Sequence, residues 1–376
     1  MFKGLREQWK QLEDCIIRPP RATYTDDELV GGTSGNFAVG VYPGVREDVE
    51  LRNGMGQLLK CSYYRPTGRS VPQDLPCVVY CHCNSGSRCD ANEVVGLLIP
   101  SGIAVMALDF SGSGRSDGEY VSLGVREVDD VGCVVAYLRE KKRTSHVAMW
   151  GRSMGAVVCL LYGERDPSVA GIVLDSPFSN LVTLMEELAT GHQGLRIPKI
   201  AIKSLIGFLR RSIKKRANFD IHHSDPLAAA QSSFIPALFG HGKDDDFIDF
   251  HHSEALYKAY AGDKNLISFE GGHNCVRPSF FHTSVCIFLA NVLGPFAQRS
   301  PERSGGHGGH GSPLASPGLA SGAAQGVDSL AASLEGSPFQ QIQGLQGHPI
   351  SPNSLQYTDE MMLQEALALS LMESTR

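Results

Sequence analysis

The sequence predicts an α/β fold in which helices cover both faces of a mostly parallel, doubly wound sheet. Three observations lead to this prediction. From about residue 56 to residue 293, short apolar runs alternate with longer amphipathic runs, as strands alternate with crossover helices. Several of the short runs are apolar almost throughout, which is typical of strands buried on both faces. The alternation is interrupted only once, by a long helical insertion.

The expected strands and helices follow one another in a regular order. The strands are predicted at residues 57–63, 77–82, 103–108, 147–150, 171–174, 235–239 and 266–269. The helices between them have apolar residues at helical spacing. They are predicted at residues 93–99, 125–142, 154–162, 253–260 and 280–293.

A largely helical insertion at about residues 178–232 replaces the crossover before the sixth expected strand. Within residues 197–216, apolar side chains that include Leu205 and Phe208 are interleaved with lysines and arginines. Such a helix can cover a substrate pocket as a lid, or it can lie on a membrane surface. We favour the lid because the segment lies inside the fold, and peripheral membrane contact through the basic lid is the alternative.

Changes in composition divide the chain into four parts. Residues 1–49 are an N-terminal extension, and residues 50–297 form the α/β domain. Residues 298–357 are rich in Gly, Ser and Pro and cannot bury enough apolar surface to offset their ordering entropy, so we expect a flexible linker. Residues 358–376 return to a helical pattern.

The charge and hydropathy of the chain limit its partners. It has 34 Lys and Arg against 40 Asp and Glu, and a formal net charge of −6, which gives no global attraction to nucleic acid. No apolar run reaches the roughly 18 residues that a membrane span needs, and none at the N-terminus has signal-peptide length. We therefore expect a cytoplasmic protein with no nucleic-acid partner and no integral membrane segment.

The cysteines fit a reducing compartment better than a metal site. Five of the ten lie in or beside expected strands and helices, as small buried residues do. The Cys and His residues at 81–83, with Cys89, lack the spacing and the second ligand pair of a zinc site. His307 and His310 fit a solvated tract. We expect no metal and no cofactor.

Residues 151–155 read GRSMG, the Gly-x-Ser-x-Gly pattern of a nucleophilic serine in a tight turn between a strand and a helix. A second match around Ser116 shows that the pattern alone is weak evidence. Ser153 follows an expected strand and opens an expected helix, which would present its hydroxyl at the carboxyl edge of the sheet. Ser116 has no helix directly after it, so we expect a loop residue there.

A nucleophilic serine needs a histidine as its base and a carboxylate to orient that histidine. His273 follows the last expected strand and has the best placement of the thirteen histidines. Three adjacent aspartates at 244–246 follow the preceding expected strand, and chemistry alone does not choose among them. Asp175, at the end of an earlier strand, is a further candidate. The order Ser153, Asp245, His273 matches the chain order expected for this type of triad.

Residues 50–293 resemble the α/β-hydrolase superfamily, in particular its serine aminopeptidase-like or ABHD-type branch. Besides GRSMG, the resemblance rests on HCNSGS at 82–87, DFSGSGRS at 109–116 and LDSPF at 174–178. It implies that Asp245 is the acid, because the carboxylate in this family follows the pattern His-Gly-x-x-Asp-x-x-aliphatic.

The same resemblance implies an oxyanion hole. One donor would be the backbone N–H of Met154, directly after the nucleophile, and the other that of Cys83 or Asn84. Cys83 stands where glycine is common in the family. The sequence therefore leaves open which of the two residues donates.

The C-terminal segment resembles a second family, the ubiquitin-interacting motif. That motif has an acidic patch, a large apolar residue, Ala three positions later, Ser four after that and an acid three beyond. This chain has Asp359-Glu360 followed by Leu363, Ala366, Ser370 and Glu373. The resemblance implies ubiquitin binding through one narrow helical stripe, and docking of this helix onto its own domain is the alternative.

Together, these patterns predict a serine hydrolase that cleaves an acyl ester or thioester through an acyl-Ser153 intermediate. A serine aminopeptidase would use the same three residues, so a small peptide substrate is the alternative within the enzymes. A hypothesis of another class is a ubiquitin-binding adaptor with a non-catalytic hydrolase scaffold. The complete set of Ser153, Asp245 and His273 argues against the adaptor.

Overall fold

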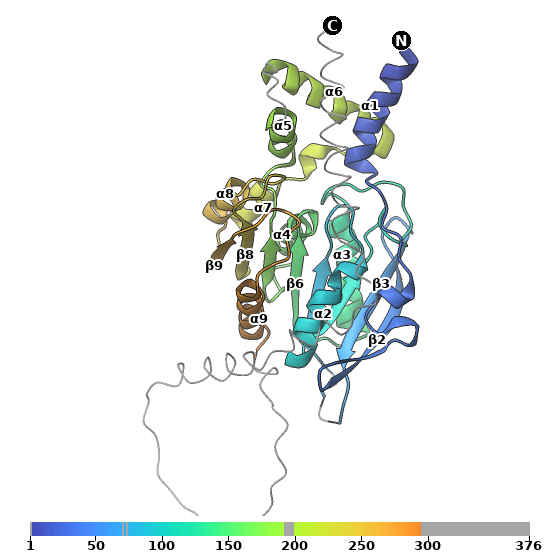
Figure 1. Ribbon diagram of the computed structural model, residues 1–376, viewed down its shortest axis with the longest axis vertical. Helices are drawn as coiled ribbons and strands as arrows, with labels where there is room; N and C mark the ends of the chain where they lie inside the picture. The colour runs from blue at the N-terminus through green and yellow to red at the C-terminus, as the bar shows by residue number, and fades with distance from the viewer. Residues whose placement is uncertain (1, 70, 73, 192–198, 295–376) are drawn as a thin grey trace, which may run out of the picture.

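The computed structural model describes residues 2–69, 71–72, 74–191 and 199–294. In these residues a single sheet has the strand order β1-β2-β3-β5-β4-β6-β7-β8-β9 (Figure 1). Its strands are β1 (Asn36–Val39), β2 (Tyr42–Arg52), β3 (Leu58–Pro66), β4 (Cys77–Cys81), β5 (Ala104–Leu108), β6 (Val147–Arg152), β7 (Ile172–Asp175), β8 (Ala237–Gly242) and β9 (Lys264–Phe269). Each of the seven expected strands corresponds to one strand from β3 to β9. The predicted α/β fold class is confirmed.

The sheet has an antiparallel part and a parallel part. Strands β1, β2, β3 and β5 pair antiparallel, and all pairs from β5 through β4 to β9 are parallel. The central strands β4 and β5 are buried at every position, because helices cover both of their faces.

The sheet begins earlier in the chain than predicted. Strand β2 pairs with β3 along its length, from Gly44 opposite Pro66 to Arg52 opposite Leu58. The predicted boundary at residue 50 therefore falls inside a strand. This strand is difficult to recognise from the sequence because it is half exposed and carries several charged side chains.

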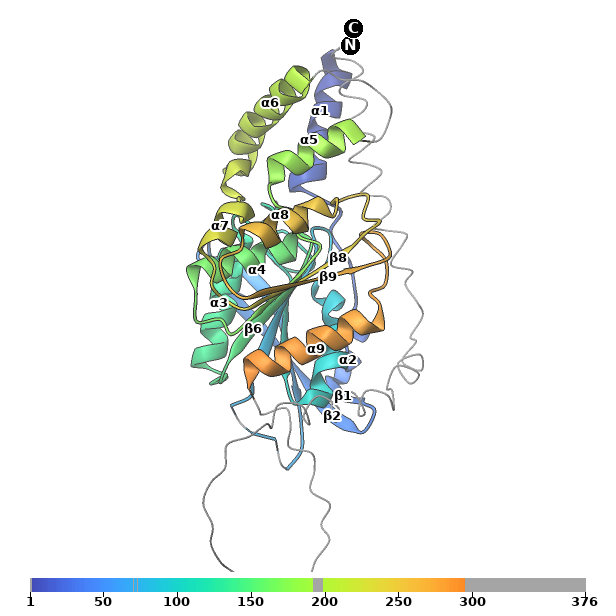
Figure 2. The same cartoon turned by 90° about the vertical axis from the view of Figure 1, so that its left-hand side faces the viewer.

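Helices cover the two faces of the sheet as a doubly wound fold requires. Figure 2 shows α2 and α9 on one side of the sheet and α3 and α4 on the other. Two clusters of buried apolar residues lie on these opposite faces. The helices of the described chain are α1 (Phe2–Ile17), α2 (Asn92–Leu98), α3 (Glu127–Glu140), α4 (Met154–Arg165), α5 (Leu181–Gly191), α6 (Lys199–Ala217), α7 (Pro226–Ser232), α8 (His251–Ala259) and α9 (Ser279–Leu293).

Helices α1, α5 and α6 form a cap at one end of the molecule (Figures 1 and 2). The helices α5, α6 and α7 come from the predicted insertion, whereas α1 belongs to the predicted N-terminal extension. Polar contacts join α1 to α6: Arg216 pairs with Glu13 at 3.1 Å and with Asp14 at 2.5 Å, and the Trp9 indole donates to the Ser212 hydroxyl. The cap therefore combines two segments that lie about 200 residues apart in sequence.

None of the helices within the described ranges has both the length and the apolar composition of a transmembrane span. The predicted linker and C-terminal segment, residues 298–376, lie outside the described residues.

Candidate active site

Ser153 occupies a sharp turn between the end of β6 and the start of α4. Its backbone has φ 55° and ψ −120°, a strained conformation with positive φ that non-glycine residues rarely adopt and that clusters at functional sites. The turn is too tight for side chains at its flanks. A Cβ on Gly151 would collide with the Gly155 backbone, and one on Gly155 would collide with the carbonyl oxygen of Cys81.

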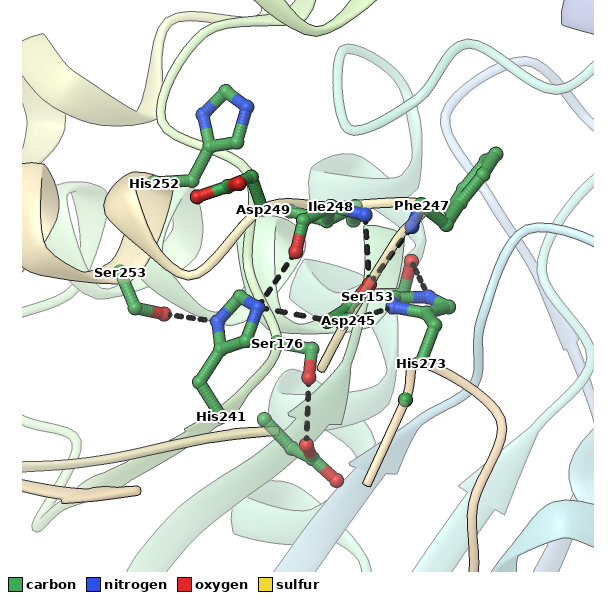
Figure 3. A network of polar contacts seen from close by, with 12 residues as sticks. Ser153, Ser176, His241, Asp245, Phe247, Ile248, Asp249, His252, Ser253 and His273 are labelled. Atoms are coloured by element: carbon green, nitrogen blue, oxygen red, sulfur yellow. Dashed lines mark hydrogen bonds and ion pairs between the residues drawn. The ribbon is translucent and has the colours of Figure 1, made fainter. Parts of the chain in front are cut away.

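The structure brings Ser153, His273 and Asp245 together although they lie on three separate segments (Figure 3). Ser153 Oγ lies 3.1 Å from His273 Nε2, and His273 Nδ1 lies 2.7 Å from Asp245 Oδ2. All three residues are buried. An ionised carboxylate accepts only, so Nδ1–H donates to Asp245, and Nε2 is free to accept the serine proton.

Asp245 is held as an anion by several donors. Its Oδ1 accepts the backbone N–H groups of Phe247 and Ile248. Burial alone would raise the pKa of Asp245, but the interactions with His273 and His241 outweigh burial, and the pKa lies well below its ordinary range. A carboxylate that stays ionised keeps His273 in the tautomer needed for a base.

His241 is a part of this site that the sequence analysis did not assign. Its Nε2 lies 2.7 Å from the Ile248 carbonyl oxygen and 3.3 Å from Asp245 Oδ2, and its Nδ1 lies 2.6 Å from Ser253 Oγ (Figure 3). Both oxygens near Nε2 are acceptors, so Nε2 carries a proton and Nδ1 accepts from the serine. The sequence could have indicated a role for His241, because it is the histidine of the His-Gly-x-x-Asp pattern by which Asp245 was chosen as the acid.

The other candidate acids lie in different surroundings. Asp244 Oδ2 accepts the backbone N–H of Gly271. Asp175 forms a buried ion pair with Arg277, which also donates to the hydroxyl of Ser176. Of Asp175 and the three aspartates at 244–246, Asp245 is the one that is hydrogen-bonded to His273 Nδ1.

Two arginines hold the loop that carries His273. Arg152, the last residue of β6 and the neighbour of Ser153, donates to the backbone carbonyl of His273 at 2.6 Å. Arg277 donates to the carbonyls of Gly272 and Cys275, on either side of His273. The sequence analysis missed both arginines, since their contacts with this loop are to backbone carbonyls that no residue pattern identifies.

The three predicted oxyanion donors differ in their position relative to Ser153. Met154 is the first residue of α4, where helical geometry leaves N–H groups without an intrahelical acceptor. Met154 and Asn84 both line the same cavity as Ser153, whereas Cys83 is not among its lining residues. His82 supports this loop: its Nε2 accepts the N–H of Phe110, so its Nδ1–H donates to the carbonyl of Cys83.

Ser116 lies in a loop and has other partners. Its hydroxyl donates to the carbonyl of Asp109 at 2.6 Å and accepts the backbone N–H of Lys60. The Asp109 carboxylate in turn accepts the backbone N–H groups of Arg88 and Arg115. These contacts give Ser116 a structural role in the DFSGSGRS segment.

Comparison with known proteins identifies the family. Residues 75–233 match the family model described as serine aminopeptidase, S33. The YqkD protein of Bacillus subtilis, described as uncharacterized, is 30% identical over 213 residues, which cover 55% of this chain and 67% of YqkD. The chain belongs to this S33 family of α/β-hydrolases.

The chain is also similar to two hydrolases whose names state an activity, one in sequence and one in structure. Human monoglyceride lipase is 31% identical over 185 residues, which cover 47% of this chain and 59% of the lipase. The solved esterase Pf2001 of Pyrococcus furiosus has a TM-score of 0.54 at 19% identity and covers 73% of this chain and 99% of its own. At that identity, the structural match supports the α/β-hydrolase fold alone.

A cavity of about 80 Å³ lies between Ser153 and the cap of this S33 family member. Apart from Ser153 and Asn84, its walls are apolar or sulfur-containing side chains. Helix α1 contributes Cys15 and Ile16, and α6 contributes Leu205, Ile206 and Leu209. The remaining wall residues are Leu123, Met154, Phe178, Leu181, Leu184, Met185, Leu188, Ala189, Phe247 and Ile248.

Polar contacts between α5 and α8 join the cap to the rest of the domain. Glu187, on α5, lies 2.9 Å from His251 Nε2 and 2.8 Å from His252 Nε2. In the described part of the chain, these three side chains form the one group with the spacing of metal ligands. The backbone N–H of Ser179 donates to His252 Nδ1, which places the His252 proton on Nε2. The arrangement therefore fits hydrogen bonding to Glu187 better than metal coordination.

Proposed function

We propose that this protein is a serine hydrolase that cleaves an ester or thioester of an apolar acyl group through an acyl-Ser153 intermediate. The observation that carries the proposal is the hydrogen-bonded series from Ser153 through His273 to Asp245, beside an apolar cavity. A serine next to such a base and orienting acid is the arrangement required for nucleophilic catalysis.

In the proposed reaction, Ser153 Oγ attacks the carbonyl carbon while its proton passes to His273 Nε2. The carbonyl electron pair moves to the oxygen, which accepts the N–H of Met154 and a second N–H from Asn84. Collapse of the intermediate breaks the bond to the alkoxide or thiolate leaving group, which takes the proton from His273. Water, deprotonated by His273, then attacks the acyl-serine. The bond between the acyl carbon and Ser153 Oγ breaks, His273 returns the proton to Oγ, and the carboxylic acid is released.

The lining of the cavity favours an apolar acyl group over a peptide. None of the cavity residues in the described chain carries a charge. A serine aminopeptidase would have to bury the ammonium group of its substrate, and an unpaired buried charge is strongly unfavourable. A buried methylene, by contrast, contributes about 0.8 kcal/mol. We therefore rank the aminopeptidase second.

The test is labelling with a fluorophosphonate probe, followed by a panel of acetyl and octanoyl esters, the matching thioesters and aminoacyl amides. We expect Ser153→Ala to abolish labelling and Ser116→Ala to retain it. Turnover of octanoyl esters and thioesters should exceed that of aminoacyl amides. Preferred cleavage of the amides would establish the aminopeptidase. Equal labelling of Ser153→Ala and wild type would overturn the assignment of Ser153, and a wild-type protein that the probe does not label would favour the non-catalytic scaffold.

A second proposal rests on the sequence pattern of the C-terminal segment, which lies outside the described residues. We propose that this segment binds ubiquitin weakly through Leu363, Ala366, Ser370 and Glu373. We also propose that the protein acts in the cytoplasm. Titration of labelled ubiquitin with the full chain should give binding that Ala366→Gln with Ser370→Ala removes, because a larger side chain at 366 would hold the partner away. Unchanged binding by the double variant would favour docking of this segment onto its own domain.

A further inference from the structure

Helix α6 has two faces with different surroundings. Its inward face is buried and includes Ile202 and Ile213, and Leu205, Ile206 and Leu209 on this side line the cavity beside Ser153. Its outward face carries two large apolar side chains. Ile200 is 81% exposed and Phe208 is 59% exposed, and these are unusual values for residues that usually avoid water.

The outward face is also strongly basic. The sequence of α6 contains seven Lys and Arg and no Asp or Glu, although the chain as a whole has a net charge of −6. Arg210, Lys214 and Arg216 pair with carboxylates of neighbouring segments. Lys203, Arg211 and Lys215 form no ion pair with a carboxylate in the described ranges, and Arg211 lies against the exposed ring of Phe208.

The apolar and basic residues share one side of the helix. At 100° per residue, Ile200, Lys203, Phe208, Arg211 and Lys215 fall within less than half of the helix circumference. A helix with exposed apolar side chains among cations is suited to the boundary between lipid headgroups and acyl chains. There the cations meet anionic headgroups while the apolar side chains enter the lipid.

We infer that the outward face of α6 docks onto an anionic phospholipid surface. Charge complementarity and the exposed Ile200 and Phe208 together select this partner, because an acidic protein would satisfy the cations but not the two apolar side chains. Docking places the helix that lines the proposed acyl cavity directly at the lipid surface. Binding itself needs neither Ser153 nor turnover, so it can succeed or fail independently of the proposed function.

The test is flotation of the full chain, as Ser153→Ala to prevent turnover, with vesicles of phosphatidylcholine alone or mixed with phosphatidylserine. We expect binding to the mixed vesicles and little to the neutral ones, decreasing as salt screens the charges. Replacing Lys203, Arg211 and Lys215 by Gln should weaken binding to the mixed vesicles about 100-fold, at about tenfold per 1.4 kcal/mol and roughly 1 kcal/mol per cation. Ile200→Ser with Phe208→Ser should weaken it as well.

The matched control replaces three other exposed cations, Arg69, Lys141 and Lys258, by Gln. This variant has the same net charge as the α6 variant and should bind mixed vesicles like the parent chain. The circular dichroism spectra and melting temperatures of all variants should agree, which separates lost binding from lost folding. Failure of the parent chain to bind mixed vesicles, equal binding to neutral vesicles, or equal losses in the α6 and control variants would each overturn the inference.

Discussion

Arg277 and Asp175 form an ion pair in which both side chains are only 3% exposed, with Nη2 and Oδ1 2.8 Å apart. The same guanidinium donates to the carbonyls of Gly272 and Cys275. The pair therefore links the end of β7 to the loop that carries His273. Burial alone would raise the pKa of Asp175, but Arg277 and Arg152 outweigh burial and lower it. Asp175 thus helps to hold the loop that carries His273, whereas Asp245 is hydrogen-bonded to the imidazole of His273 itself.

We predict that Asp175→Asn lowers the free energy of unfolding by about 3–5 kcal/mol, because it leaves the charge of Arg277 buried without its partner. Asp175→Asn combined with Arg277→Met removes that stranded charge, so the double variant should be more stable than the sum of the two single changes predicts. Urea unfolding of the four proteins measures the coupling. Additive effects would show that Asp175 and Arg277 are not energetically coupled.

We predict that Asp245→Asn lowers kcat by about 10⁴, because the amide favours the wrong tautomer of His273. Asp244→Asn and Asp246→Asn are the matched neighbours, and each should change kcat by less than about tenfold, since neither is hydrogen-bonded to His273. Steady-state kinetics on a soluble ester provides the measurement. A larger loss in either neighbour than in Asp245→Asn would show that another aspartate is the acid.

The sequence predicted the parallel half of the sheet well for a physical reason. Strands buried on both faces, such as β4 and β5, must be apolar at almost every position, and the turn around Ser153 needs Gly151 and Gly155 for steric reasons. Both requirements leave visible patterns in the residue order. The positions of Ser153 and His273 followed from the same rule, because the carboxyl ends of parallel strands meet at one edge.

The features that the sequence missed depend on contacts between distant segments. The packing of α1 on α6 rests on pairs such as Arg216 with Glu13, and no local pattern connects two residues so far apart. The orientation of α6 was also misjudged in one respect. Leu205 lines the cavity as expected of a lid residue, whereas Phe208 faces solvent. Helical periodicity groups residues into faces but does not show which neighbour covers each face.

We predict that stability decreases as the pH falls below about 6.5, partly because of His252. Burial lowers the pKa of His252 below its ordinary value, although the nearby carboxylate of Glu187 raises it. The unfolded chain, with a histidine pKa of about 6.5, then binds a proton that the folded chain does not bind, so unfolding becomes more favourable as the pH falls from 6.5 to the folded pKa. His252→Asn should reduce this slope by up to about 1.4 kcal/mol per pH unit.

Urea unfolding at several pH values between about 5 and 8 measures the slope. The control is His146→Asn, which changes an exposed histidine and should keep the pH dependence of the wild type. An unchanged slope in His252→Asn would contradict the assignment, as would a wild-type protein that gains stability when the pH falls through this window.

We predict that, of two residues three positions apart on α6, one affects the choice between long and short acyl substrates and the other does not. Leu205 lines the cavity beside Ser153. Leu205→Ser therefore removes a part of the apolar cavity wall that only a long acyl chain would contact. At roughly 25 cal/mol per Å² of lost apolar contact, the kcat/KM for an octanoyl ester should fall about tenfold more than that for the acetyl ester. Phe208→Ser changes a side chain that faces solvent and should leave the ratio of the two soluble esters unchanged. Equal losses for acetyl and octanoyl esters in Leu205→Ser would mean that Leu205 stabilises the cap without contacting the acyl chain, and a shifted ratio in Phe208→Ser would mean that α6 turns its outward face toward the substrate.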